Sequence, residues 1–317
     1  MCGIVGYVGW REPSSVLIDG LRRLEYRGYD SCGIAILDNG IPKLLRATGQ
    51  IANLEGLLPK NGSSSHEIRC GIGHTRWATH GQPTENNAHP HRDCRGEFLV
   101  AHNGIIENYV QLREMLMDHG HRFETETDTE VLPHLVESYF RGDLLAAVRA
   151  ALARVEGVYA LAVVSQCDSK KIIVARNGPP IVLGLGQGEN FAASDVFALL
   201  PFTRSVLFLN DGETAIVGPD SIELQDRSGS RIDRAPESIT WSADMAQKEG
   251  YAHYMLKEIF EQPRSIRNTL MGRVSANHEL TLEAELGSPD IFSDCERIYL
   301  VGCGTSLHAA MVGRSGA

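Results

Sequence analysis

Short apolar runs rich in valine and isoleucine follow one another from Cys2 to about Val217. They lie at residues 3–9, 32–37, 69–78, 97–104, 159–165, 171–177, 205–210 and 214–218, and turn residues separate them. Runs of this length between turn signals are typical of β-strands. Amphipathic patterns at 14–28, 108–120 and 127–157 predict helices that end at glycine. Strands with helices between them indicate packed sheets covered by helices.

The pattern changes beyond about residue 219. A polar stretch leads into a predicted helical segment at 245–271, interrupted at Pro263, so a linker with connecting helices is expected over 221–290. Residues 297–301 then have the pattern of a buried strand followed by a glycine turn and the start of a helix. Because a lone strand cannot fold, residues 291–317 are expected to be the truncated start of a second domain.

Composition narrows the classes of protein. A hydrophobic content of 43% suffices for a large core, and no apolar run approaches the ~18 residues of a membrane span. The formal net charge of -10 gives no general attraction to nucleic acid or anionic lipid. The N-terminus lacks the basic region of a secretory signal, and the seven cysteines form no CxxC pair. We therefore expect a cytoplasmic protein without nucleic-acid or membrane partners.

Cys2 directly follows Met1. If the methionine is removed, Cys2 carries a thiol and a free α-amine, which titrates near ~8 and can act as a base at neutral pH. A residue whose own amine activates its side chain is an N-terminal nucleophile. Position alone favours the alternative that Cys2 is a small buried residue at the start of a strand, so the interpretation depends on the neighbouring motifs.

Five motifs follow in a fixed order: MCGIVGYVG, LEYRGYDS, GHTRWATHG, HNGIIEN and ETDTEV. Together they resemble the class II, N-terminal nucleophile glutamine amidotransferases, and most closely the branch that aminates fructose 6-phosphate to glucosamine 6-phosphate. The resemblance continues through GYAHYMLKEIFEQP and VGCGTS to about Gly313. It implies an α+β fold with a four-layer αββα sandwich at residues 2–220, then the linker and a truncated α/β sugar isomerase fragment.

The resemblance also implies an activity. The chain is expected to hydrolyse L-glutamine without a cofactor, and the full-length enzyme to be a homodimer that delivers the ammonia to fructose 6-phosphate. This chain would retain glutamine hydrolysis but not sugar amination, because most of the isomerase half is missing.

Within these motifs the resemblance assigns a catalytic set. Cys2 is the expected nucleophile, and the side-chain amide of Asn103 and the backbone N–H of Gly104 are expected to stabilise the tetrahedral oxyanion. Arg76 and Asp128 match the residues that bind the α-carboxylate and α-ammonium of glutamine. Taken singly, Asn-Gly is also a common turn dipeptide, and Arg76 and Asp128 could be a surface ion-pair residue and a helix N-terminal charge.

Further residues have supporting roles. Trp77, Thr79 and His80 lie on a loop that is expected to close over the bound amino acid. Arg27 is expected to support the nucleophile and Gly28 to form a turn. Cys32 stands where the family more often has alanine, which affects no catalytic role.

The motif GCGTS is a glycine turn that leads into a helix N-terminus, where backbone N–H groups and hydroxyls can bind phosphate. Such a turn is a weak signal by itself. The resemblance makes Thr305 and Ser306 the expected hydroxyl ligands of a partial sugar-phosphate site.

Cysteines and histidines between residues 70 and 94 raise the question of a metal. The set is Cys70, His74, His80, His89, His91 and Cys94. Its spacing matches no closed tetrahedral zinc pattern, and the family motifs account for most of it. No metal site is therefore predicted.

Two alternatives stay open. Another amidotransferase of the class, of the phosphoribosyl pyrophosphate or asparagine synthetase type, would share Cys2, Arg76, Asn103 and Asp128, although residues 250–263 and GCGTS argue against it. An inactive or partner-binding fragment is favoured if Met1 is retained, because no amine base would then remain.

Overall fold

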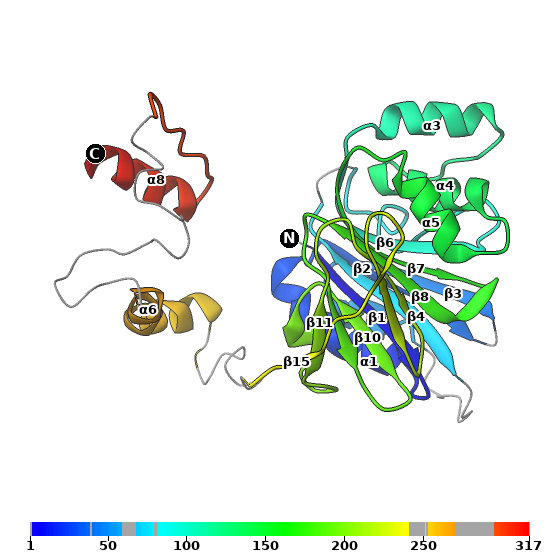
Figure 1. Ribbon diagram of the computed structural model, residues 1–317, viewed down its shortest axis with the longest axis horizontal. Coiled ribbons are helices and arrows are strands. Elements are labelled where there is room, and N and C mark those ends of the chain that lie inside the picture. The colour runs from blue at the N-terminus through cyan, green and yellow to red at the C-terminus, as the bar shows by residue number, and fades with distance from the viewer. Residues whose placement is uncertain are drawn as a thin grey trace. The chain divides into compact units, whose positions relative to one another are not determined.

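The computed structural model describes residues 2–38, 40–58, 68–78, 81–240, 251, 253–270 and 295–316. The chain divides into two compact units, Met1–Ala246 and Gln247–Ala317. In the first unit the described strands form two sheets (Figure 1).

The first sheet has the order β15-β11-β9-β10-β1-β4-β2-β3. Its strands are β1 (Gly3–Gly9), β2 (Ser31–Asp38), β3 (Ile41–Thr48), β4 (Arg69–Arg76), β9 (Val182–Leu185), β10 (Asn190–Ala193), β11 (Ser205–Phe208) and β15 (Glu237–Ser238). Every pairing within it is antiparallel. The N-terminal strand β1 is therefore central, and Gly3 lies opposite Thr75 at the end of β4.

The second sheet has the order β14-β13-β12-β8-β7-β6-β5 and is also antiparallel. Its strands are β5 (His91–Arg92), β6 (Phe98–Ile106), β7 (Gly157–Ser165), β8 (Asp168–Asn177), β12 (Thr214–Val217), β13 (Ile222–Gln225) and β14 (Arg231–Ile232). Apolar residues from both sheets form one buried cluster, which includes Ile4, Ile72, Ala101 and Ala162. The sheets therefore pack face to face and exclude water from their inner surfaces.

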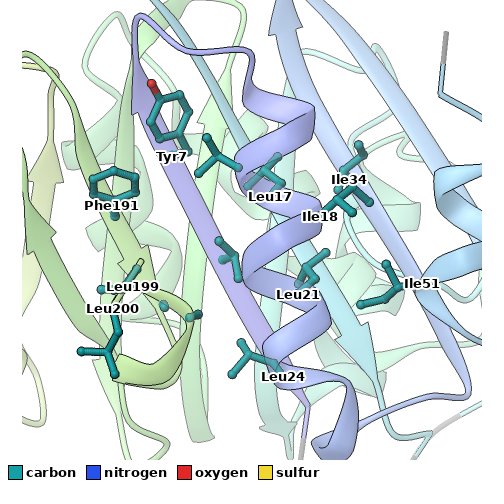
Figure 2. Packing of buried hydrophobic residues seen from close by; sticks show 14 of the residues in the cluster. Tyr7, Leu17, Ile18, Leu21, Leu24, Ile34, Ile51, Phe191, Leu199 and Leu200 are labelled. Carbon is teal, nitrogen blue, oxygen red and sulfur yellow. The ribbon is translucent and has the colours of Figure 1, made fainter. Parts of the chain in front are cut away.

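Helix α1 (Pro13–Leu24) covers the outer face of the first sheet together with α2 (Ile51–Glu55) and the 3-10 turn η3 (Val196–Ala198). Proline at the first helical position suits the start of α1, because its missing N–H has no partner there. Leu17, Leu21 and Leu24 recur at helical spacing and belong to one buried cluster with Tyr7 and Phe191 of the sheet (Figure 2).

Helices α3 (Tyr109–Asp118), α4 (Val131–Tyr139) and α5 (Leu144–Leu152) cover the outer face of the second sheet (Figure 1). The pattern at 127–157, expected to be one helix, contains the 3-10 turn η2 (Asp128–Glu130), α4 and α5. The break after α4 has a physical cause: Phe140 is extended and Gly142 has a φ of 100°, which L side chains rarely adopt.

The layers are helices, sheet, sheet and helices, which confirms the predicted αββα sandwich. The boundary differs from the expected residue 220, because β13, β14 and β15 add residues 222–238 to the two sheets. These strands are short and rich in polar side chains, which concealed them in the sequence.

The C-terminal unit contains α6 (Tyr254–Leu270), with Pro263 inside it, and α8 (Thr305–Gly316). Residues 297–301, expected to form a buried strand, are exposed and form no strand among the described residues. A strand needs a neighbour for its backbone groups, and none lies beside this segment in the described part of the chain. No described helix combines the length and apolar character needed to cross a membrane.

Candidate active site

A pocket of about 400 Å³ opens where β1 begins and β4 ends. It brings together six residues that the sequence placed in the site: Cys2, Arg76, Trp77, Asn103, Gly104 and Asp128. The other lining residues are His89, His102, Ile105, Thr129, Val158, Pro179, Pro180 and Ser194.

Cys2 lies at the entrance to β1, with its sulfur directed at the loop that follows β4. The backbone N–H of Trp77 donates a hydrogen bond to Sγ of Cys2 at 3.1 Å. Burial raises the pKa of the Cys2 thiol, and the Trp77 N–H only partly opposes this rise. The thiol is therefore protonated at neutral pH, so a base must remove its proton before it can act as a nucleophile.

Asn103 faces Cys2 from β6, and His74 fixes the direction of its amide. Nε2 of His74 lies 3.0 Å from Oδ1 of Asn103 and 3.0 Å from the carbonyl of His102. Both partners are acceptors, so Nε2 must carry the hydrogen. With Oδ1 held in this way, Nδ2 of Asn103 points toward the nucleophile and donates to the Cys2 carbonyl at 3.1 Å.

Gly104 cannot be replaced by a residue with a side chain without moving the backbone. Its φ is 136°, and a Cβ atom here would lie 2.0 Å from the Val158 carbonyl oxygen on β7. Strand β7 pairs with β6 along this stretch, with Gly104 opposite Tyr159. The glycine therefore lets the β6 backbone line the pocket beside Asn103.

Four buried histidines lie at the pocket: His89 and His102 line it, and His74 and His91 are in contact with this pair. The rings of His74 and His89 stack with centroids 4.1 Å apart, and His91 meets His89 edge-on at 4.5 Å. His102 bonds Thr129 through Nδ1 at 2.8 Å. Burial lowers the pKa of all four, to about 3 for His74 and His91, so they are neutral at pH 7. His74 and His102 lie within the recognised motifs and His89 and His91 between them, but the spacing of the four did not indicate the network.

Arg76 and Asp128 place one cation and one anion in the same pocket. The Arg76 guanidinium donates to the carbonyls of Gln82 and Gly81 at 3.2 and 3.3 Å, which fixes its position. Asp128 is buried and accepts the Ile106 N–H at 2.8 Å. A fixed pair of opposite charges is suited to the carboxylate and ammonium of an amino acid.

The loop after β4 is held by two residues of the LEYRGYDS motif. Asp30 accepts the Ala78 N–H at 2.8 Å and donates its own N–H to the Arg76 carbonyl at 3.1 Å. A Cβ on Gly28 would lie 2.8 Å from the Arg76 carbonyl carbon. Gly28 was expected to provide a turn, but its φ of -167° is extended and suits any residue. Glycine is required here because the Arg76 backbone lies too close for a side chain.

Trp77 lines the pocket at the protein surface, and the other predicted residues lie elsewhere or outside the described part. Trp77 keeps 47% of its surface exposed and meets Tyr29 edge-on at 5.5 Å. Thr79, His80 and the side chain of Arg27 lie outside the described residues. Thr305 and Ser306 are exposed at the start of α8 in the C-terminal unit.

Comparisons with known proteins agree with this geometry. Residues 74–201 match the family model described as a glutamine amidotransferase domain. The chain is 46% identical to a glutamine--fructose-6-phosphate aminotransferase (isomerizing) of Clostridium tetani and 50% identical to that of Gloeobacter violaceus. Each match covers 99% of this chain and 51% of the relative, so the chain spans about half the length of these curated relatives.

A solved structure supports the same assignment. The glutamine phosphoribosylpyrophosphate amidotransferase from B. subtilis superimposes with a TM-score of 0.60 and 27% identity, over 73% of this chain and 50% of that chain. The αββα sandwich is thus the fold of the N-terminal nucleophile hydrolases. With this fold, the matched domain and the relatives named above, the chain contains a glutamine amidotransferase domain.

Proposed function

We propose that this chain hydrolyses L-glutamine to glutamate and ammonia, with the thiol of Cys2 as nucleophile. The observation that carries the proposal is the convergence of that thiol, the oriented amide of Asn103 and a fixed pair of charges on one pocket. No other class of reaction accounts as well for a thiol, an oxyanion donor and an amino-acid site together.

The first step requires a base near the thiol. In the proposed mechanism Met1 has been removed, and the free α-amine of Cys2 takes the proton from Sγ. The thiolate attacks the carboxamide carbon of glutamine, and the carbonyl oxygen becomes a tetrahedral oxyanion. An amide has two N–H hydrogens, so Asn103 can donate to this oxyanion as well as to the Cys2 carbonyl, beside the backbone N–H of Gly104.

The intermediate then collapses. The C–N bond breaks, the α-ammonium of Cys2 protonates the departing nitrogen, and ammonia leaves a glutamyl thioester on Sγ. A water molecule, deprotonated by the same amine, attacks the thioester and releases glutamate with a free thiol. One base therefore serves both half-reactions.

Substrate choice in this scheme depends on charge. Arg76 binds the α-carboxylate and Asp128 the α-ammonium, so that glutamine is held at both ends while its side-chain amide reaches Cys2. Trp77, Thr79 and His80 are proposed to close over the bound amino acid, with Arg27 in support.

In the whole enzyme we propose that the ammonia is delivered to fructose 6-phosphate. Support comes from the names of the curated relatives, whose similarity runs through the C-terminal unit as well. Residues 295–316 would then begin a sugar isomerase domain, with Thr305 and Ser306 in its phosphate-binding loop after the linker. A cytoplasmic homodimer is proposed for the full-length protein, and delivery to phosphoribosyl pyrophosphate is the less favoured alternative.

The test is glutamate release from glutamine by the purified chain, with an intact-mass measurement on the same sample. We expect release from the chain without Met1, and loss of release in Cys2→Ala. Cys167→Ser, an exposed cysteine in the turn between β7 and β8, is the matched control and should keep full activity. Absence of release from correctly processed protein would contradict autonomous glutaminase activity and favour the inactive fragment.

A further inference from the structure

Four side chains converge on the outer side of the second sheet, away from the active-site pocket. Cys94 lies in the turn between β5 and β6, and His121 lies between α3 and η2. His134 and Glu137 are three residues apart on one face of α4. Their ligand atoms all lie within 4.8 Å of one another.

Five of the distances between these atoms run from 3.1 to 3.9 Å, close to those between the ligands of a tetrahedral cation. Nδ1 of His121 lies 3.3 Å from Nδ1 of His134, and Sγ of Cys94 lies 3.6 Å from His134 and 3.9 Å from His121. Oε2 of Glu137 lies 3.1 Å from His121 and 3.8 Å from His134. Zinc bonds of about 2.0–2.3 Å in tetrahedral geometry separate neighbouring ligand atoms by about 3.3–3.6 Å.

Hydrogen bonding leaves the two inward-facing ring nitrogens without protons. Ser138 Oγ donates its one hydrogen to the His134 carbonyl at 2.9 Å, so the 3.0 Å contact with His121 Nε2 requires that nitrogen to be the donor. Nδ1 of neutral His121 is then a bare lone pair. His134 Nε2 faces Oε1 of Glu130 at 3.9 Å, which favours the proton on Nε2 and leaves its Nδ1 bare too.

Two ring lone pairs, a carboxylate oxygen and a sulfur therefore face one another in a small volume. Without an ion, a proton on His121 Nδ1 could satisfy Glu137, and the Cys94 thiol could donate weakly to His134 Nδ1 at 3.6 Å, so that each proton serves one acceptor only. A divalent cation at the centre interacts favourably with all four atoms at once. Arg95 does not take this place, because it approaches the other oxygen, Oε1 of Glu137, at 3.7 Å and lies on the surface.

We propose that Cys94, His121, His134 and Glu137 bind one Zn²⁺ ion. Sulfur and imidazole nitrogen are donors that zinc prefers, whereas Mg²⁺ and Ca²⁺ require oxygen ligands. Four protein ligands close the coordination sphere, as in structural rather than catalytic zinc sites. The surroundings support the ligands: the Arg122 N–H donates to Cys94 Sγ at 3.2 Å, as backbone N–H groups do to metal-bound thiolates.

The ion would join three segments that hydrogen bonds and packing already bring together. It would tie the β5–β6 turn and the segment after α3 to helix α4. Helix α4 continues directly from η2, which carries the Asp128 of the active site. The sequence predicted no metal site because it was searched for zinc patterns that combine Cys94 with the cysteine and histidines before it. The three partners proposed here follow Cys94 by 27, 40 and 43 positions.

The test is the metal content of the purified full chain after dialysis against metal-free buffer. We expect stoichiometric zinc in the wild type, and its loss in Cys94→Ser and in His121→Ala. The matched controls are Cys167→Ser and His119→Ala, an exposed cysteine and a histidine two positions from His121 that bonds the Met115 carbonyl. Both controls should keep the zinc.

Cobalt gives a second, spectroscopic measurement. Co²⁺ in place of zinc should give the strong visible bands of tetrahedral coordination and a thiolate-to-cobalt charge-transfer band that Cys94→Ser abolishes. Far-UV circular dichroism identifies any variant that fails to fold. Because Cys94 is exposed, its replacement by serine should leave the fold intact, so Cys94→Ser is the decisive variant. Absence of stoichiometric zinc and cobalt binding in the wild type, or equal binding by folded Cys94→Ser, would overturn the proposal.

Discussion

Asn103 shows how a single residue depends on a partner from a distant part of the sequence. The motif HNGIIEN was enough to expect an oxyanion donor, but the direction of its amide is set by His74 on β4. Sequence spacing could not reveal this contact, because the two residues meet only when the sheets pack. Asp30 was missed for the same reason, although it lies within a motif that had been recognised.

Removing the amide should affect the chemical step. For Asn103→Ala we expect kcat for glutamine hydrolysis to fall about 10²–10³-fold, with little change in KM, because the donor acts mainly on the oxyanion. Steady-state glutamate release measures this. His74→Ala should cause a smaller fall of the same kind, and a KM effect alone in either variant would contradict an oxyanion role.

Asp128 permits a separate test of substrate binding. Asp128→Asn keeps an oxygen that can accept the Ile106 N–H, but removes the negative charge. We expect KM for glutamine to rise at least about tenfold, the equivalent of roughly 1.4 kcal/mol, while the protein unfolds at nearly the same denaturant concentration. Comparing glutamine with an analogue that lacks the α-amine checks the assignment, since the analogue should not distinguish the variant from wild type.

At the scale of elements, strands that are buried along their whole length were easier to predict from the sequence than strands that are partly exposed. Strands such as β1 and β4 are buried along their whole length, so their apolar runs stood out in the sequence. Strand β3 alternates exposed and half-buried residues and contains Pro42, and β13 to β15 are short and polar, so these lacked a strong signal. The division of 127–157 into α4 and α5 depended on one turn that the helical periodicity did not show.

That turn also contains a testable helix cap. Oδ1 of Asp143 accepts the Ala146 N–H at 3.1 Å at the start of α5. Asp143→Ala should lower the free energy of unfolding by about 1 kcal/mol, because an N–H of the first turn loses its partner. Asp143→Ser, which can still cap, should be close to wild type in urea denaturation. Glutamine hydrolysis should be unchanged in both, since the cap lies outside the pocket; equal stability of the two variants would show that the cap contributes nothing.

At the scale of the whole molecule, the four buried histidines connect stability to pH. His74, His89, His91 and His102 lie where the two sheets and η2 meet, and burial keeps their pKa values below the ordinary 6.5. The unfolded chain therefore binds more protons than the folded one as pH falls below 6.5. The stabilisation is present above pH 6.5 and is lost on acidification. For His91, burial and nearby Arg76 lower the pKa, while Glu130 raises it.

A window of pH brings out this effect, to which His121 adds because burial lowers its pKa too. Buried Glu130 has its pKa lowered to about 2 despite burial, through nearby His134 and through hydrogen bonds from the Glu124 N–H and from the N–H and hydroxyl of Thr125, so its contribution is lost only below about pH 4.5. Between pH 6.5 and 5, each histidine that stays neutral in the folded state should cost about 1.5 kcal/mol of unfolding free energy. Urea denaturation with a chelator present measures the slope without any contribution from bound metal. His91→Gln should reduce it by one histidine's share and exposed His119→Gln should not, whereas a flat profile would mean that protons reach these histidines in the folded protein.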